Sequence, residues 1–374
     1  MGVIIIQITL LKSLGNNPYY TKFLSIKKIL PKKGEYKNLM IHTAELIAKI
    51  KYKDYHFLLQ QKNVKIDNFQ NVYLHTLNSI GITTIQAYPQ KIENGYIFWC
   101  KIIINLNRVA NNGKQTPFPF VVNDNNIYKL KENFSKFIKE LLPHHTSIFY
   151  WSVQRIDYTI DIKTPNVKEY IKLLQRGDKP PFYKIDNEKQ HKKEIDKTHY
   201  PNGVRYKNKS ATINIYDKYE ERKEKAKYKG DLLENCKDIL RLEIQCFKRK
   251  TITLKRKFKN KENGIKAFLI SEEQQRKLFK YYLSHICGKA NYYEYAKALK
   301  RIEESKIHDK TKKALKEILL AVAKTKSVWK TKLILKPQKY RNYFQKLEKL
   351  NINPATIPRR WEKTELININ RLIE

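Results

Sequence analysis

The feature that most constrains the fold of this chain is a strict alternation of polar and apolar residues, Arg-Ile-Asp-Tyr-Thr-Ile-Asp-Ile, over residues 155–162. Successive side chains of a β-strand point to opposite faces, so Tyr158 and the isoleucines share one face. Asp157 and Asp161 project together from the other face, beside Arg155. The alternation therefore predicts a strand with one apolar face and one charged face.

A second predicted strand, residues 239–247, has the same alternation and places Arg241 and Glu243 on one face. If the two strands are neighbours in one sheet, Asp157 or Asp161 can gather with Glu243 around one divalent cation. Oxygen ligands without a clear histidine favour Mg²⁺ or Mn²⁺ over zinc. The alternative is that both faces are exposed and that arginine and acidic side chains pair across the strands.

The chain carries a large positive charge. Its 374 residues include 76 Lys and Arg against 36 Asp and Glu, a formal net charge of +40, and the mean hydropathy is −0.65. Self-repulsion on this scale is typical of proteins that bind a polyanion, and nucleic acid is the leading candidate. Segments 178–203 and 248–257 are the expected contacts with a DNA backbone. The DNA-binding residues predicted are Arg241, Lys248, Arg249, Lys250, Lys255, Arg256 and Lys257.

An anionic membrane is the rival polyanion, but the sequence has no convincing amphipathic anchor, apolar span or lipidation signal. The apolar run over residues 3–10 is too short to cross a bilayer and is predicted to be a buried strand. Cys100, Cys236, Cys246 and Cys287 lie far apart without a CxxC pair, which disfavours a zinc knuckle and a disulfide scaffold. We therefore expect a soluble protein of a bacterial host cytoplasm that does not bind membranes.

The predicted fold class is α+β, with an antiparallel sheet and helices on one face. Residues 1–115 are predicted to form a β-rich region that binds DNA, residues 116–305 a catalytic domain, and residues 306–374 a helical region. Segment 178–203 is dense in charge and is predicted to be a flexible loop. Strands are predicted over 96–106, 148–151, 155–162, 211–216 and 239–247, a strand edge over 248–257, and helices over 127–142, 167–175, 310–328 and 340–350.

Two adjacent tyrosines are the predicted nucleophiles. Ser271 and Gly288 have the positions of caps for one helix, and Asn291 begins the capping pattern of the next. Tyr292 and Tyr293 would then lie in the first turn of a helix, where free N–H groups favour a phosphate. The alternative is ordinary packing, because the chain has 25 tyrosines.

Attack by a tyrosine makes strand cleavage a transesterification, in which the tyrosine becomes joined to the phosphate. This step requires a metal to orient and polarise the phosphate. The metal ligands predicted are Asp157, Asp161 and Glu243. Lys218 follows the strand over 211–216 and is the predicted clamp on a non-bridging oxygen, with a solvated lysine as the alternative.

The order of several segments resembles the filamentous-phage gene II type replication initiators and their relatives on phages and plasmids of low-GC bacteria. The segments that carry the resemblance are residues 155–161, 172–178, 213–218 and 240–246, with 105–108 and 351–358 similar to the flanking segments. The resemblance implies a Rep-type nickase core that cuts one strand at a rolling-circle origin. It further implies a tyrosine joined to the 5′-phosphate and a free 3′-OH for a host polymerase.

Two alternatives to this function differ in what they require. A non-catalytic origin-binding initiator or DNA-binding regulator would use the basic surface without forming an adduct. A conjugative relaxase shares the chemistry but normally has a histidine cluster, which this sequence lacks. The expected partners of the nickase are origin DNA, single-stranded or supercoiled, a host helicase and polymerase, and a second copy of the chain.

Overall fold

The fold is given by a computed structural model, and all of its described residues belong to one compact unit. The described residues are 39–116, 118–185, 202–224, 230–258, 262, 264–269, 272–335 and 337–373. The strand predicted over 3–10, the cap predicted at Ser271 and residues 186–201 of the predicted basic loop lie outside them.

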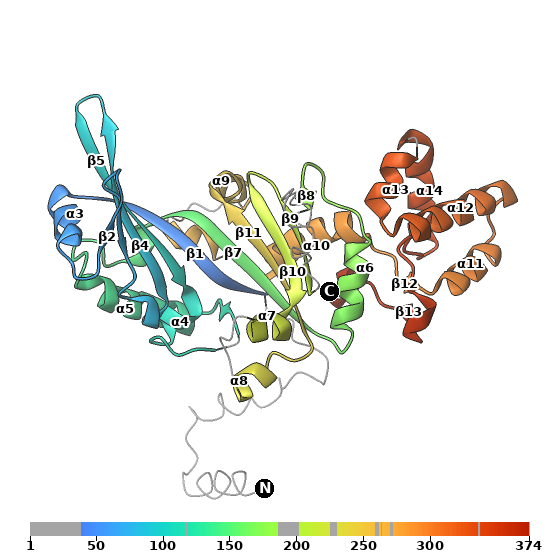
Figure 1. Cartoon of the computed structure of the whole chain (residues 1–374), viewed down its shortest axis with the longest axis horizontal. Helices are drawn as coiled ribbons and strands as arrows, with labels where there is room; N and C mark the ends of the chain where they lie inside the picture. Colours follow the sequence, from blue (N-terminus) through green and yellow to red (C-terminus); the bar gives the residue numbers. More distant parts are fainter. Residues whose placement is uncertain are drawn as a thin grey trace, which may run out of the picture. The chain divides into compact units, whose positions relative to one another are not determined.

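One antiparallel sheet forms the centre of the unit (Figure 1). Its strands follow the order β2-β3-β4-β5-β1-β7-β11-β10-β9-β8, and β6 pairs with β1. Because β1 pairs with β7, strands from the first 115 residues and from the central part of the chain share this sheet. The strands are β1 (Leu39–Ile50), β2 (Lys65–Ile66), β3 (Val72–Leu74), β4 (Ile82–Ile92), β5 (Gly95–Asn105), β6 (Phe120–Val121), β7 (Ser152–Lys163), β8 (Lys184–Ile185), β9 (Gly203–Lys207), β10 (Ala211–Asp217) and β11 (Ile239–Phe247).

Helices lie beside the sheet and make up most of the last hundred residues. The longer ones are α3 (Tyr52–Leu59), α5 (Asp124–Lys139), α6 (Val167–Gln175), α9 (Lys248–Lys257), α10 (Glu272–Cys287), α11 (Tyr295–Glu303), α12 (Asp309–Thr325) and α14 (Pro337–Lys349). The shorter ones are α4 (Leu106–Ala110), α7 (Lys218–Glu224), α8 (Asp231–Glu234), α13 (Val328–Ile334) and α15 (Ile369–Leu372), and a separate two-stranded sheet pairs β12 (Tyr292–Tyr293) with β13 (Glu365–Leu366). No helix among the described residues is both long and apolar enough to cross a bilayer.

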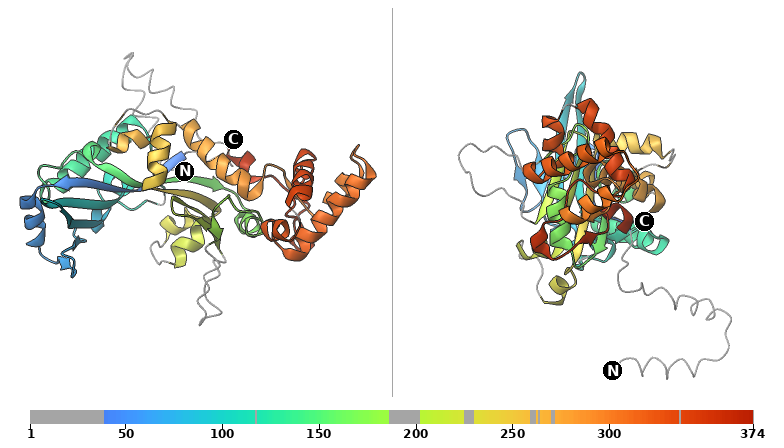
Figure 2. Two further views of the ribbon diagram at one scale, coloured as in Figure 1. Left: turned by 90° about the horizontal axis from the view of Figure 1, so that it is seen from above. Right: turned by 90° about the vertical axis from the view of Figure 1, so that its right-hand side faces the viewer.

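Helices flank the sheet on both sides. Figure 2 shows α5, α9 and α10 on one side and α7 with α8 on the other. The prediction of helices on one face alone is therefore wrong for α7. This helix begins at Lys218, directly where β10 ends, and its first side chain is almost fully buried beside the sheet.

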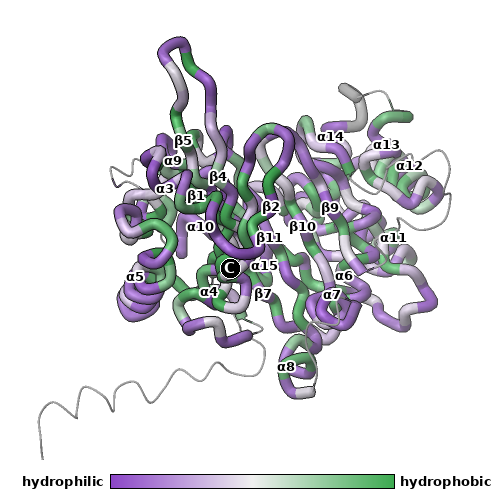
Figure 3. The backbone as a smooth tube through the Cα atoms, turned by 60° about the vertical axis from the view of Figure 1, so that its left-hand side comes forward, coloured by the Kyte–Doolittle hydropathy of each residue, from purple (hydrophilic) through white to green (hydrophobic). Residues whose placement is uncertain are grey.

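Alternation along the strands produces two different sheet faces, and hydrophobic and hydrophilic residues alternate along β10 and β11 (Figure 3). The strands predicted over 155–162, 211–216 and 239–247 are confirmed as parts of β7, β10 and β11. The helices predicted over 127–142 and 167–175 are confirmed as α5 and α6. The α+β class with a large antiparallel sheet is thus confirmed.

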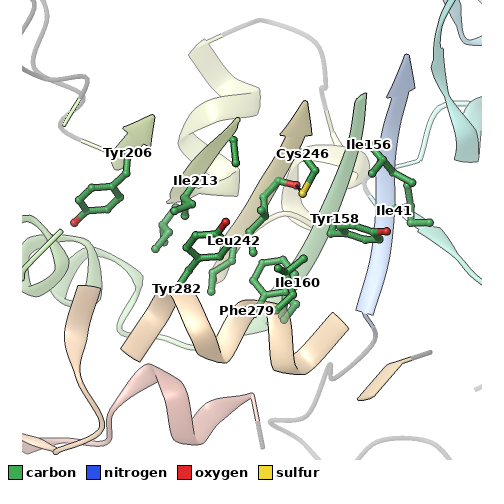
Figure 4. Close-up of a cluster of buried hydrophobic side chains, with 14 of the residues drawn as sticks. Ile41, Ile156, Tyr158, Ile160, Tyr206, Ile213, Leu242, Cys246, Phe279 and Tyr282 are labelled. Atoms are coloured by element: carbon green, nitrogen blue, oxygen red, sulfur yellow. Dashed lines mark hydrogen bonds between the residues drawn. The ribbon is translucent and has the colours of Figure 1, made fainter. Parts of the chain in front are cut away.

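Helix α10 covers the apolar face of β7, β11 and β10 (Figure 4). Its buried side chains recur every three or four residues, which gives a continuous apolar stripe. Phe279 and Tyr282 from this stripe are buried among Tyr158, Ile160 and Leu242. The Tyr158 hydroxyl donates to the Phe268 carbonyl at 3.0 Å, so the one polar atom of that ring has a partner.

Two other predicted elements are wrong. Residues 148–150 form a 3₁₀ turn before β7 rather than a strand. The basic segment 248–257 forms helix α9 rather than a strand edge, because Thr251 and Leu254 are buried at a helical spacing while Ile252 is exposed. The apparent alternation of Ile252 and Leu254 in the sequence did not reflect a strand.

Shortening Phe279 should destabilise the fold strongly. Phe279→Ala removes a fully buried ring between α10 and the sheet, and we expect it to lower the free energy of unfolding by about 3–5 kcal/mol. The matched control is Tyr281→Ala on the same helix, whose ring is 51% exposed and should cost less than about 1 kcal/mol. Urea unfolding followed by circular dichroism measures both, and equal losses would contradict this account of the core.

Candidate functional site

The two charged strand faces predicted from the sequence are brought together in the sheet. Strands β7 and β11 are direct neighbours, and their register places Arg241 opposite Asp161 and Glu243 opposite Thr159. Asp157 lies one step further along the same face, opposite Gln245. We call this surface the polar face; it includes Asp157, Thr159, Asp161, Arg241 and Glu243, with Tyr216 of β10 and Lys218 of α7.

Arg241 and Asp161 form a buried ion pair across the two strands. Nε and Nη2 of Arg241 donate to the two carboxylate oxygens of Asp161, each at 2.6 Å, and neither residue is more than 3% exposed. This is the cross-strand pairing that the sequence left as the alternative. It neutralises Asp161 as a metal ligand and removes Arg241 from the surface that could contact DNA.

Asp157 is a buried carboxylate with an altered affinity for protons. Its pKa is raised to about 6, chiefly by burial and in smaller part by the neighbouring carboxylates Glu243 and Glu45, whereas Arg155 opposes the shift. Arg155 holds both oxygens, with Nε and Nη2 at 2.8 and 2.5 Å, so a cation would bind Asp157 only by displacing Arg155, whose side chain is 26% exposed, whereas that of Arg241 is fully buried. Perturbed carboxylates of this kind are concentrated at functional sites.

Lys218 is a buried cation at the edge of the polar face. It is 1% exposed, and its pKa is lowered to about 7, chiefly by burial and in smaller part by the charges of Arg241 and Arg222. Its ammonium group lies 3.0 Å from the Glu221 carboxylate, one turn further along α7. A lysine held in this way is an appropriate partner for a phosphate oxygen, since an added negative charge would relieve the repulsion around it.

Tyr216 and His42 complete the polar face from two other strands. The Tyr216 hydroxyl donates to Oε1 of Glu243 at 2.6 Å, and burial followed by the Glu243 charge raises its pKa well above the usual range. Burial lowers the pKa of His42 on β1, and the charges of Arg241 and Lys218 lower it further. Four strands, β1, β7, β10 and β11, together with helix α7, therefore contribute titratable groups to one region.

A divalent cation fits the centre of this face better than its Arg241 edge. The Thr159 hydroxyl oxygen is buried without a hydrogen-bond partner among the described residues, and it lies between Asp157 and Asp161 on β7 and opposite Glu243. Buried oxygens without a partner indicate a site for water or an ion. No three His, Cys, Asp or Glu side chains in the described ranges are grouped closely enough to hold a metal by themselves. Mg²⁺ typically uses one or two carboxylates together with substrate phosphates, and Asp157 with Glu243 matches that number.

The predicted nucleophiles lie elsewhere. Tyr292 and Tyr293 form β12, a strand rather than the first turn of a helix, and both are almost fully buried. Burial raises the pKa of Tyr292 well above its usual range, with further contributions from Cys287 and Tyr170. The backbone of β12 pairs with β13, and this pairing, made 70 residues later in the chain, overrides the local capping pattern. The structure does not bring these tyrosines to the polar face.

The predicted basic segment lies on the other side of the sheet from the polar face. Lys248, Arg249, Arg256 and Lys257 of α9 are exposed, whereas Lys250 and Lys255 are partly buried. The Lys250 ammonium lies 5.3 Å from the ring centroid of Tyr282, which belongs to the helix on the apolar face. The exposed side chains of α9 therefore form a separate cationic surface.

His42, Glu45 and Arg222 were missed by the sequence analysis. His42 and Glu45 are more than 100 residues from β7, and only the pairing of β1 with β7 brings them close. Arg222 follows from the helical turn that begins at Lys218. A strand pattern over residues 39–50, with Glu45 between apolar neighbours, was the signal that could have located β1.

The buried lysine predicts an unusual dependence of stability on pH. The pKa of Lys218 is about 7 in the folded protein and near 10.5 in an unfolded chain, so the unfolded chain binds more protons between these values. The cost of burying the cation is complete below about pH 7 and disappears as the pH rises. Relative to Lys218→Met, the wild-type chain should gain roughly 2–3 kcal/mol of unfolding free energy between about pH 7 and pH 9.5. Chemical unfolding of both proteins at matched pH measures this, and a constant difference would contradict it.

The chain has no match among models of known protein families and none among curated proteins. Its function therefore has to be argued from the polar face, the separate cationic surface of α9 and the net charge.

Proposed function

We propose that this chain is a rolling-circle DNA replication initiator, which nicks one strand at its origin by a metal-dependent attack of a tyrosine. The products would be a 5′-phosphotyrosine link and a free 3′-OH. The observation that carries the proposal is the convergence of Asp157, Glu243 and Lys218 on one sheet face of a protein with a net charge of +40. The Rep-type nickase core and the identity of the metal are part of this proposal.

Different residues of the polar face would have different roles in phosphoryl transfer. Asp157 and Glu243 would hold Mg²⁺ or Mn²⁺, with the Thr159 hydroxyl as a further oxygen, and the ion supplies polarisation of the phosphate. Lys218 would bind a non-bridging oxygen, where its charge stabilises the extra negative charge of the transition state. Arg241 acts indirectly, because its pair with Asp161 fixes the strand next to Glu243.

The attacking tyrosine must approach these residues. Tyr292 and Tyr293 are buried in β12, so a reaction through either requires this strand to leave its pairing with β13. The Tyr216 hydroxyl already lies within the polar face, at 2.6 Å from Glu243. A test of the function therefore has to identify the peptide that carries the DNA.

Nicking is tested with supercoiled DNA that carries the flanking region of the chain's own gene. With Mg²⁺ or Mn²⁺ we expect nicked circles and a protein–DNA adduct that survives denaturation, and chelation should abolish both. Glu243→Gln should lower the nicking rate by about 100-fold, because it removes one of the two carboxylates that would hold the metal. Asp309→Asn, at a residue that is 95% exposed, is the control and should leave the rate unchanged.

Mass spectrometry of the adduct peptide, supported by Phe substitutions of Tyr216, Tyr292 and Tyr293, identifies the nucleophile. Tight binding without an adduct under either metal would contradict the nickase and favour the non-catalytic origin-binding initiator or regulator. An adduct on a serine or another residue type would contradict the tyrosine mechanism alone.

The cationic surface of α9 should contribute to affinity without sequence preference. Replacing Lys248, Arg249, Arg256 and Lys257 together with Gln should reduce the slope of log affinity against log salt concentration by about three to four. Fluorescence anisotropy with duplex DNA at several salt concentrations measures the slope. An unchanged slope would show that the DNA backbone contacts another surface.

A further inference from the structure

The polar face does not end at β7 but continues across the first half of the sheet. Glu45 of β1 lies opposite Arg155 of β7, and its charge contributes to the raised pKa of Asp157. On its other side Glu45 lies 3.8 Å from the Lys101 ammonium group of β5. A continuous row of polar side chains therefore connects Asp157 to strands β1, β5 and β4.

Aromatic side chains occupy this extension. Trp99 of β5 lies directly opposite Tyr88 of β4 and Lys49 of β1, and Tyr73 of β3 lies opposite Gln86 of β4. In an antiparallel pair, residues directly opposite each other share a face. We call Tyr73, Tyr88 and Trp99 the aromatic row, with Lys49 and Lys101 beside it.

The aromatic row is on the same face as Glu45. Successive residues of β1 alternate between faces, and Lys49 is separated from Glu45 by four residues. Burial and the Glu45 charge both raise the pKa of Tyr88, which places the Tyr88 ring near that carboxylate. Four residues of strand span about 13 Å, so the row reaches to within roughly 20 Å of Asp157.

Helices α3 and α5 pack against the opposite face of this part of the sheet. Tyr55 of α3 lies 4.9 Å from the ring of Phe98, whose strand neighbour Trp99 points the other way. Phe134 of α5 packs on Trp151. Lys49 is exposed, and Tyr73, Tyr88 and Trp99 are partly exposed. The row is thus a partly exposed aromatic surface on a strongly basic protein.

We propose that the aromatic row binds single-stranded DNA and guides it toward Asp157 and Glu243. This inference rests on the proposed function, because it supplies the unpaired strand on which a nickase acts. Bases stack on exposed aromatic rings regardless of their sequence, whereas a duplex hides its base faces. Lys49 and Lys101 lie beside the rings, where a backbone phosphate would follow the stacked bases. Because the row continues into the polar face, a strand bound along it would lead toward Asp157 and Glu243.

The test measures binding of a labelled oligo(dT) of about 20 nucleotides and of a duplex of equal length to the full chain. Trp99→Ala and Tyr88→Ala should each weaken oligo(dT) binding by about ten-fold, because each removes one stacking surface, and leave duplex binding within about two-fold. Trp99→Phe keeps a stacking ring and should restore most of the affinity. Tyr128→Ala is the control, since Tyr128 is 62% exposed on α5, on the other side of the sheet.

Unchanged oligo(dT) affinity in Trp99→Ala, or an equal loss for oligo(dT) and duplex, would overturn the inference. Thermal unfolding of Trp99→Phe and Tyr128→Ala verifies that the fold is kept. The binding measurement does not require the chain to nick DNA. If the wild-type chain forms the adduct but Trp99→Ala and Tyr88→Ala keep full affinity for oligo(dT), this inference alone is refuted. A selective loss of oligo(dT) binding in a chain that never nicks would refute the proposed function alone.

Discussion

The arrangement of this protein depends on the buried ion pair between Arg241 and Asp161, at the centre of the sheet. One face of the sheet at this point is apolar and covered by α10, and the other is the polar face. A buried carboxylate and guanidinium must satisfy each other, since leaving either unpaired costs about 3–5 kcal/mol. Their two hydrogen bonds at 2.6 Å fix the register of β7 against β11. A one-residue shift of β11 against β7 would turn Arg241 toward α10, in the apolar core, and leave Asp161 without its partner.

This register determines the chemistry that the sheet offers. Glu243 is held opposite Thr159, and Asp157 one step further, so two carboxylates and an orphan hydroxyl oxygen face the same region. The covering helix α7 places Lys218 at the edge of that region, where burial rather than a strong partner lowers its proton affinity. The polar face thus combines two carboxylates, which we propose as ligands of a metal ion, with a buried ammonium group, which we propose as the partner of a phosphate. Single-strand binding on the aromatic row would use the same face further along the sheet.

The sequence predicts the strands and helices whose conformation is determined by the pattern of neighbouring residues. Strict alternation predicted β7 with Asp157 and Asp161 on one face and β11 with Arg241 and Glu243 on one face, and a helical period predicted α6. That Asp157 and Glu243 share a face was expected only on condition that the two strands are neighbours. The pairing of Arg241 with Asp161 was foreseen only as one of two alternatives, because alternation gives the face of a side chain but not its partner.

What the sequence does not predict depends on contacts between distant segments. The strand conformation of Tyr292 and Tyr293 comes from pairing with residues 365–366, and the contribution of His42 and Glu45 comes from pairing of β1 with β7. Neither pairing can be recognised from the residues that are adjacent to it in the sequence. Helix α9 was missed for another reason. A short basic segment with two apolar residues is compatible with the periodicity of a strand and with that of a helix.

The central claim is that the polar face holds a divalent cation between Asp157 and Glu243, and cleavage by a bound iron ion tests it most directly. Fe²⁺ substituted for Mg²⁺, with ascorbate and peroxide, cuts the polypeptide next to the place where the ion is bound. The account predicts cuts in β7 and β11 near these two residues, suppressed by excess Mg²⁺ and lost in Glu243→Gln. Cuts confined to other strands, or cuts at β7 and β11 that persist in Glu243→Gln, would contradict it.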